Sequence, residues 1–288
     1  MFLIFRNFCF NLLEGNSNKL MIILDNILVP FVDSPSAIGA LKTAITLSKI
    51  HNAKLHVIHV LTDKSNETVL DRIKEVCTKE NAVFTFIERS GNIQKEVIKA
   101  EREIGIDLIV MGAYGKTGWQ QFWVGSNAFK VISTSHCPVL TLQNDVGELK
   151  GFNKIMLPLD DSEETRQKVN WVAKMAKGFD AEVLIFNTTK VRGEDTRIKL
   201  AQYAQQVEAL LHKDGIKTSF DESYGNNIAE DCIKFAQMHE CDLITIMTET
   251  ENTNSFFMGT YAQQLVSSSP IPVLTIHARS VNKLQTLA

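Results

Sequence analysis

The sequence predicts an α/β protein built from two doubly wound, parallel-sheet domains in tandem. Short apolar runs typical of buried strands alternate with segments whose apolar residues recur at helical spacing. The length of 288 residues suits two such domains better than one. The same order of strands, helices and short motifs also occurs twice along the chain, at a nearly constant offset. The strand–helix alternation implies right-handed crossovers and a five-stranded parallel sheet in each copy.

Each element of the first copy follows from its local pattern. Continuous apolar runs predict strands at 22–30, 54–61, 82–87, 107–111 and 138–142. Apolar residues at helical spacing predict helices over 37–47, 66–79, 93–100 and 126–133. Ser34 and Ser36 are the candidate N-caps of the first helix, because serine hydroxyls accept from free amides there.

The second copy repeats these signals. Lys154-Ile-Met-Leu-Pro158 echoes Asn26-Ile-Leu-Val-Pro30, and Ile271-Pro-Val-Leu-Thr275 echoes the run Cys-Pro-Val-Leu-Thr that begins at Cys137. A polar, glycine-bearing stretch at 144–151 marks the boundary between the copies. We therefore expect domains at 21–146 and 151–280, with a C-terminal tail at 281–288.

Residues 1–20 precede the first expected strand and need a separate interpretation. The segment is apolar but interrupted by Arg6, Asn7 and Asn11, and it is too short to span a bilayer. It lacks the basic start and the small-residue cleavage site of a signal peptide. We expect a disordered or non-native upstream extension, and the alternative is an apolar tail that docks on a partner or a membrane surface.

Charge and composition exclude several classes of function. A net charge of −3 argues against a nucleic-acid or anionic-membrane surface, and no segment predicts an integral membrane helix. The five cysteines form no Cys-x-x-Cys pair and the histidines form no His-x-x-x-His pair. We expect no metal site and a reducing, cytoplasmic location.

A glycine-rich loop joins the expected fourth strand to the last helix of the first copy. It reads Gly-Ala-Tyr-Gly-Lys-Thr-Gly-Trp-Gln-Gln-Phe-Trp-Val-Gly-Ser-Asn, from Gly112 to Asn127. After Gly112, the residues that define the spacing of this loop are Gly115, Gly125 and Ser126. Glycines let backbone amides approach an anion, and the following helix adds free N–H groups and its positive dipole end. The loop thus suggests phosphate binding, although a tight structural βα loop would have the same glycines.

The spacing of the loop decides which nucleotide motif it matches. Neither the P-loop pattern nor the Gly-x-Gly-x-x-Gly pattern is present. The loop instead has the form Gly-x2-Gly-x9-Gly-Ser, followed by Cys-Pro-Val-Leu at 137–140. This combination resembles the ATP-binding loop and last strand of universal stress proteins, and the resemblance extends over both copies from Met21 to about Ala278.

The resemblance implies a Rossmann-like sheet of strand order 3-2-1-4-5 that binds ATP, ADP or AMP, with Mg as an accompanying ion. The nucleotide would occupy the crevice between the first and fourth strands. It implies adenine contacts from Pro30, Phe31, Val32, Asp33 and Val60. It places Gly112 near ribose, and Gly115, Gly125, Ser126 and Asn127 at the phosphates.

Each copy departs from the family pattern at one place. Many members have an aspartate two residues after the strand proline, where the first copy has Val32 and the second has Asp160. In the second copy we align Thr248 and Glu251 with the first two glycines, so only Gly259-Thr260 is kept. Glutamates near a phosphate are repulsive. We expect a competent site in the first copy and a lost or altered one in the second.

These observations lead to a stress-response or regulatory protein that binds nucleotide and is not an enzyme. No paired carboxylates and no nucleophile with an adjacent base are evident, so no catalytic residue is assigned. The alternatives are a slow ATPase and a nucleotide-independent interaction module.

The last strands predict how the copies associate. Pro138–Leu142 and Pro272–Ile276 would each leave one free apolar edge, and such an edge favours pairing with another strand. We expect the two edges to pair within one chain as a pseudo-dimer, with a homodimer as the alternative.

Overall fold

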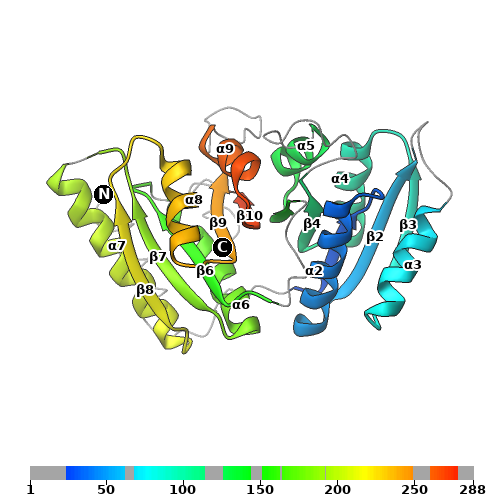
Figure 1. The fold of residues 1–288 in the computed structure, drawn as a ribbon, viewed down its shortest axis with the longest axis horizontal. Coiled ribbons are helices and arrows are strands. Elements are labelled where there is room, and N and C mark those ends of the chain that lie inside the picture. Colours follow the sequence, from blue (N-terminus) through cyan, green and yellow to red (C-terminus); the bar gives the residue numbers. More distant parts are fainter. Residues whose placement is uncertain are drawn as a thin grey trace, which may run out of the picture.

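The computed structural model describes residues 24–61, 68–113, 126–143, 151–162, 164–191, 193–248 and 260–277. Its strands form one ten-stranded sheet in the order β3-β2-β1-β4-β5-β10-β9-β6-β7-β8 (Figure 1). We call residues 24–143 lobe 1 and residues 151–277 lobe 2. Each lobe has the predicted 3-2-1-4-5 order with parallel neighbours, so the predicted fold class is confirmed. The expected extension at 1–20, the linker at 144–150 and the tail at 281–288 lie outside the described residues.

The elements alternate through both lobes. Those of lobe 1 are β1 (Asn26–Pro30), α2 (Pro35–His51), β2 (Lys54–Leu61), α3 (Val69–Lys79), β3 (Thr85–Ser90), α4 (Ile93–Ile104), β4 (Leu108–Gly112), α5 (Ser126–Thr134) and β5 (Val139–Leu142). Those of lobe 2 are β6 (Lys154–Leu159), the 3-10 helix η1 (Glu164–Lys168), α6 (Val169–Phe179), β7 (Glu182–Thr188), α7 (Glu194–Lys213), β8 (Thr218–Ser223), α8 (Ile228–Met238), β9 (Leu243–Thr248), α9 (Thr260–Ser268) and β10 (Val273–His277).

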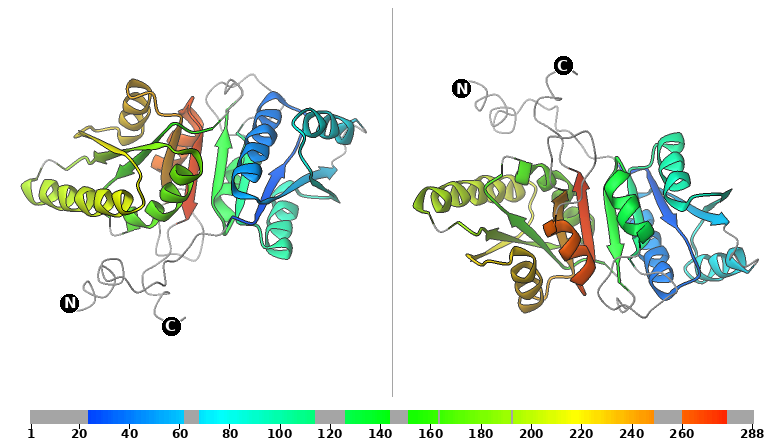
Figure 2. Two further views of the ribbon diagram at one scale, coloured as in Figure 1. Left: turned by 90° about the horizontal axis from the view of Figure 1, so that it is seen from below. Right: turned by 90° about the horizontal axis from the view of Figure 1, so that it is seen from above.

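Helices cover both faces of the sheet (Figures 1 and 2). One apolar core lies under α2, α3, α6 and α7, and a second lies under α4, α5, α8 and α9. Each core continues from one lobe into the other. Among the described residues no helix is both long and apolar enough to cross a membrane.

The lobes join where β5 and β10 pair antiparallel, with Leu140 opposite Leu274. Both leucines are fully buried. Thr141 adds a hydrogen bond from its hydroxyl to the Val273 carbonyl at 3.2 Å. These are the two strands whose free edges the sequence predicts to pair.

The N-termini of the two first helices differ between the lobes. In lobe 1 the Ser34 hydroxyl caps α2 by accepting the Ala37 amide, and Pro35 occupies the first turn, where its missing N–H costs nothing. Ser34, rather than Ser36, is therefore the N-cap. In lobe 2 the corresponding segment forms η1, and α6 begins only at Val169.

Candidate functional site

Two neighbouring strands separate at the same place in each lobe. β1 and β4 pair only through Ile27 with Leu108 and Leu28 with Ile109. β6 and β9 likewise pair only over their first residues. Toward their carboxyl ends the strands diverge, which is where doubly wound sheets bind ligands. We call this gap the switch-point crevice.

The residues after β1 support the crevice of lobe 1 more than they line it. Phe31 is 1% exposed, and its side chain belongs to the core beneath α2. Its carbonyl lies 2.9 Å from Nδ1 of His59, and its amide donates to the Ile58 carbonyl at 2.8 Å. Phe31 therefore fixes the loop, and its side chain is not free to contact a base.

The other expected adenine residues surround the end of the same strand pair. Pro30 ends β1 and is half-buried, and Val32 and Asp33 follow it, also half-buried. Val32 packs on the core under α2, whereas Val60 is buried in the core under α4 and α5. The structure thus brings Val32 and Val60 to opposite faces of the sheet.

Gly112 ends β4 in close contact with the start of α2. A β-carbon added at Gly112 would lie 2.5 Å from the Ser36 hydroxyl oxygen and 2.8 Å from its carbonyl carbon. Real β-carbons do not approach backbone atoms this closely, so only glycine fits here without displacement. The glycine expected near ribose therefore also has a packing role.

The phosphate positions are only partly described. Gly115 and Gly125 lie outside the described residues, as does the side chain of Ser126. Ser126 begins α5, and Asn127 is exposed in the first turn of that helix.

The register of lobe 2 corrects the alignment that placed Thr248 opposite Gly112. Because Leu243 pairs with Ile155 as Leu108 pairs with Ile27, the residue corresponding to Gly112 is Met247. Lobe 2 therefore has a side chain at the position where lobe 1 has none. The replacement of the first α-helical turn by η1 is consistent with this change.

Asp160 keeps the aspartate of the family pattern but is engaged locally. Its Oδ1 accepts the Ser162 amide at 2.9 Å and also the Ser162 hydroxyl. Its own amide donates to the Thr165 hydroxyl at 3.2 Å. This carboxylate therefore stabilises the turn before η1.

Lys168 is a notable residue of lobe 2 that the sequence analysis did not single out. It is only 3% exposed, and Nζ donates to the Thr165 hydroxyl at 3.3 Å. Burial lowers the pKa of the Lys168 ammonium, and the nearby Asp160 opposes that shift. The aligned position in lobe 1 is Ala40, so comparing the two copies residue by residue would have revealed the difference.

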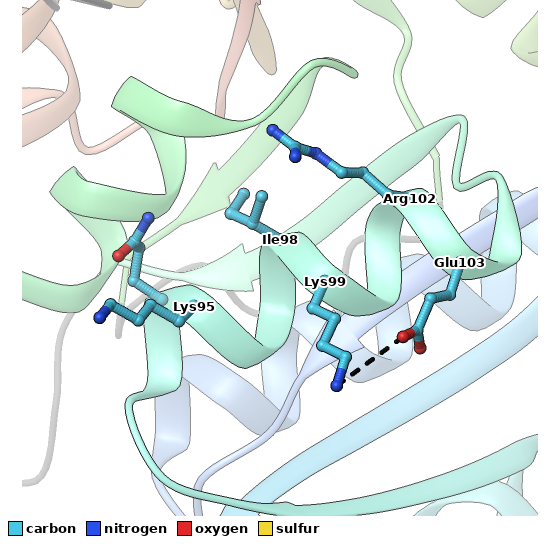
Figure 3. A pocket seen from close by; sticks show the side chains of 6 residues that line it. Lys95, Ile98, Lys99, Arg102 and Glu103 are labelled. Carbon is cyan, nitrogen blue, oxygen red and sulfur yellow. Dashed lines mark ion pairs between the residues drawn. The ribbon is translucent and has the colours of Figure 1, made fainter.

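A groove of about 400 Å³ lies on the outer side of α4, away from the loop after β1 (Figure 3). Its lining residues are Gln94, Lys95, Ile98, Lys99, Arg102 and Glu103. Lys99 pairs with Glu103 at 3.9 Å, and Arg102 lies 3.4 Å from His136. No predicted site residue lines this groove, so it is separate from the crevice.

The described residues hold no cluster of three or more side chains suited to a metal ion. Within that part of the chain, Cys77, Cys137, Cys232 and Cys241 are all buried, free thiols.

Comparison with known proteins extends over both lobes. The universal stress protein family model matches residues 24–143 and again residues 151–277. A universal stress protein of Methanocaldococcus jannaschii is 26% identical over 137 residues, covering 41% of this chain and 81% of that protein. One of Bacillus subtilis is 25% identical over 153 residues, covering 44% of this chain and 99% of that protein.

Solved structures match the whole two-lobed arrangement. A Pseudomonas aeruginosa protein described as functionally unknown has a TM-score of 0.70 at 15% identity, covering 90% of this chain and 94% of that chain. A universal stress protein from Archaeoglobus fulgidus has a TM-score of 0.69 at 16% identity, covering 88% of this chain and 98% of that chain. At these identities the likeness shows the fold alone. The matching family model is that of stress proteins rather than of an enzyme family, and the chain belongs to the universal stress protein family, with two copies of its domain in tandem.

Proposed function

We propose that lobe 1 binds an adenine nucleotide in its switch-point crevice. ATP is the preferred ligand, with ADP and AMP as alternatives. The protein then acts in the cytoplasm as a nucleotide-binding regulator of a stress response, without dedicated catalysis.

One observation carries this proposal. β4 ends at Gly112 beside the crevice, and α5 starts at Ser126, so residues 113–125 connect the crevice to a helix N-terminus. The intervening chain supplies Gly115 and Gly125 at the spacing of the family's nucleotide loop. Free amides at the start of α5 favour an anion in this position.

The described residues fit a nucleotide better than a metal bound by the protein alone. Val32 is an uncharged, half-buried residue on the loop after β1, which suits the apolar face of a base. Mg would be held mainly by the phosphates, because the described part of the chain has no cluster of metal ligands.

A matched pair of substitutions tests the location. Gly125→Val and Gly259→Val place the same side chain before α5 and before α9. Calorimetry with ATP should show at least a ten-fold loss of affinity for Gly125→Val and wild-type affinity for Gly259→Val. Gly115→Val should behave like Gly125→Val, because a branched side chain would stand where the phosphates lie. Equal affinity in the wild type and all three variants would refute the site.

The absence of an assigned catalytic base has its own test. With Mg present, any ATP hydrolysis should be far slower than about 1 s⁻¹, the lower range of dedicated enzymes. Turnover at or above that rate would show that the protein is an enzyme.

We also propose that the β5–β10 joint persists in solution and makes each chain a pseudo-dimer. The support is the burial of Leu140 and Leu274 against each other in the antiparallel register. Leu140→Lys would bury an ammonium there, so we expect two separate melting transitions or aggregation. A monodisperse variant with one unchanged transition would contradict the proposal, and a wild-type mass of two chains would favour the homodimer.

A further inference from the structure

The two crevices differ at four corresponding positions. The correspondence follows from the strand registers, from the matching starts of α4 and α8 at Ile93 and Ile228, and from those of α5 and α9. Lobe 1 has Val32, Ala40, Val97 and Asn127, and lobe 2 has Asp160, Lys168, Cys232 and Tyr261. Lobe 2 thus has a lysine where lobe 1 has an alanine, and a tyrosine where lobe 1 has an asparagine.

Lys168 reaches the crevice of lobe 2 from the α6 face. It ends η1, yet its ammonium interacts electrostatically with Asp160 after β6 and with Cys232 on α8. The core under α6 and the core under α8 lie on opposite faces of the sheet. Nζ of Lys168 donates to the Thr165 hydroxyl, and the same hydroxyl accepts the amide of Asp160 directly after β6, so the ammonium lies beside the carboxyl end of β6.

Tyr261 enters from the other face. It stands in the first turn of α9, and its hydroxyl lies 3.4 Å from Sγ of Cys232. Burial raises the pKa of the Tyr261 hydroxyl well above its ordinary range, and Cys232 and Asp160 add to the shift. The same Asp160 carboxylate therefore acts on both Lys168 and Tyr261.

We propose that Lys168 and Tyr261 close the switch-point crevice of lobe 2 from within, so that this lobe takes no ligand there. Lys168 fills the space from the η1 side and Tyr261 from the α9 side, with Cys232 between them. That a chain would bind a nucleotide in lobe 1 rests on the proposed function. The closure of lobe 2 does not rest on it.

The closure has an energetic basis. A ligand in this crevice would have to displace a buried ammonium from the influence of Asp160 and break the contact between Tyr261 and Cys232. In lobe 1 the corresponding side chains are short and uncharged, so no such displacement is required.

Cys232 provides a direct measure of the closure. Its thiol is fully buried, and burial raises its pKa to about 12, so the wild type should react very slowly with a small thiol reagent. We would label Lys168→Ala and Tyr261→Asn, which introduce the lobe 1 residues, with methyl methanethiosulfonate and locate the label by peptide mass spectrometry. Each variant should label at Cys232 at least ten-fold faster than the wild type.

The other buried thiols separate local opening from unfolding. Cys77 in lobe 1 and Cys241 in lobe 2 should keep their wild-type rates. Lys168→Met, which keeps most of the side-chain volume, should label Cys232 more slowly than Lys168→Ala.

Two results would overturn the proposal. One is an unchanged labelling rate of Cys232 in both variants. The other is equal acceleration of labelling at Cys232 and Cys241, which would show that Lys168 and Tyr261 stabilise lobe 2 as a whole and do not close the crevice. If Lys168→Ala does not fold, Tyr261→Asn alone decides. Failure of wild-type protein to bind nucleotide would refute the proposed function and leave the labelling result unaffected.

Discussion

Acidification should weaken the contact between the lobes, because two partly buried histidines lie at that contact. Nε2 of His277 on β10 lies 3.0 Å from the Ser135 hydroxyl of lobe 1, and Nδ1 lies 3.2 Å from the Thr248 hydroxyl. Burial and the neighbouring His136 lower the pKa of His277 from 6.5 to about 4, although a backbone hydrogen bond with Ile132 opposes the shift.

His51, at the end of α2, lies at a second place where the lobes meet. A β-carbon added to Gly178 of α6 would be 2.6 Å from Cε1 of the His51 ring. Burial and the charge of Lys174 lower the pKa of His51 from 6.5 to about 4.

The direction and size of the change in unfolding free energy follow from the lowered pKa values of the two histidines. Each histidine takes up a proton more readily in the unfolded chain, so its contribution to stability is fully present above pH 6.5 and is lost as the pH falls toward 4. Between pH 7.5 and pH 5 the loss is about 2 kcal/mol per histidine for a fully shielded ring. Both rings are partly exposed, which reduces the expected loss to about 1 kcal/mol each.

Urea unfolding at the two pH values measures this loss. The double variant His51→Gln, His277→Gln should lose about 2 kcal/mol less than the wild type on acidification. His212→Gln, at an exposed histidine within lobe 2, is the matched control and should behave like the wild type. Carboxylates such as Glu182, whose pKa is lowered by its hydrogen bond from Ser219, also titrate but are the same in all variants. An equal loss in the wild type and the double variant would refute the reasoning.

Three further substitutions test individual contacts by thermal melting. Gly112→Ala should destabilise the protein by about 1–3 kcal/mol, because the added methyl group meets Ser36 backbone atoms; an unchanged midpoint would contradict this packing. Gly178→Ala should cost about 1 kcal/mol or more by pushing His51 aside, and a stabilised variant would show that the two helices have room to spare. Glu101→Ala should cost about 2–3 kcal/mol, because its Oε1 accepts two backbone amides just before β5, and a loss below about 0.5 kcal/mol would show that water replaces them.

Most of the fold could be predicted because strand runs and helical spacing are local and occur twice. The third strand is the clearest shift: it was expected at 82–87 and lies at Thr85–Ser90. Val83 suggested a buried strand but is 93% exposed, because it belongs to the approach to an edge strand. An apolar run alone does not distinguish a buried strand from the exposed chain that leads into an edge strand.

The site could be predicted from the sequence only where it depends on residues that lie close together in the chain. The glycine spacing and the strand–loop–helix order can be read from the sequence, whereas the contact between Gly112 and Ser36 depends on how α2 meets β4. Phe31 was expected at a base, but its ring is in the core, since the strand-end pattern does not specify which way a side chain turns. Lys168 is buried because of how η1 packs against the rest of lobe 2, which the local sequence does not specify.

The antiparallel joint has a directional consequence. All strands of lobe 1 run one way and all strands of lobe 2 run the other, as the opposed arrows of β5 and β10 in Figure 2 show. The two crevices consequently lie at opposite rims of the single sheet, and each rim combines the carboxyl ends of one lobe with the amino ends of the other. The surface along the rim beside the lobe 1 crevice is therefore composite, with the carboxyl ends of the lobe 1 strands next to the amino ends of the lobe 2 strands.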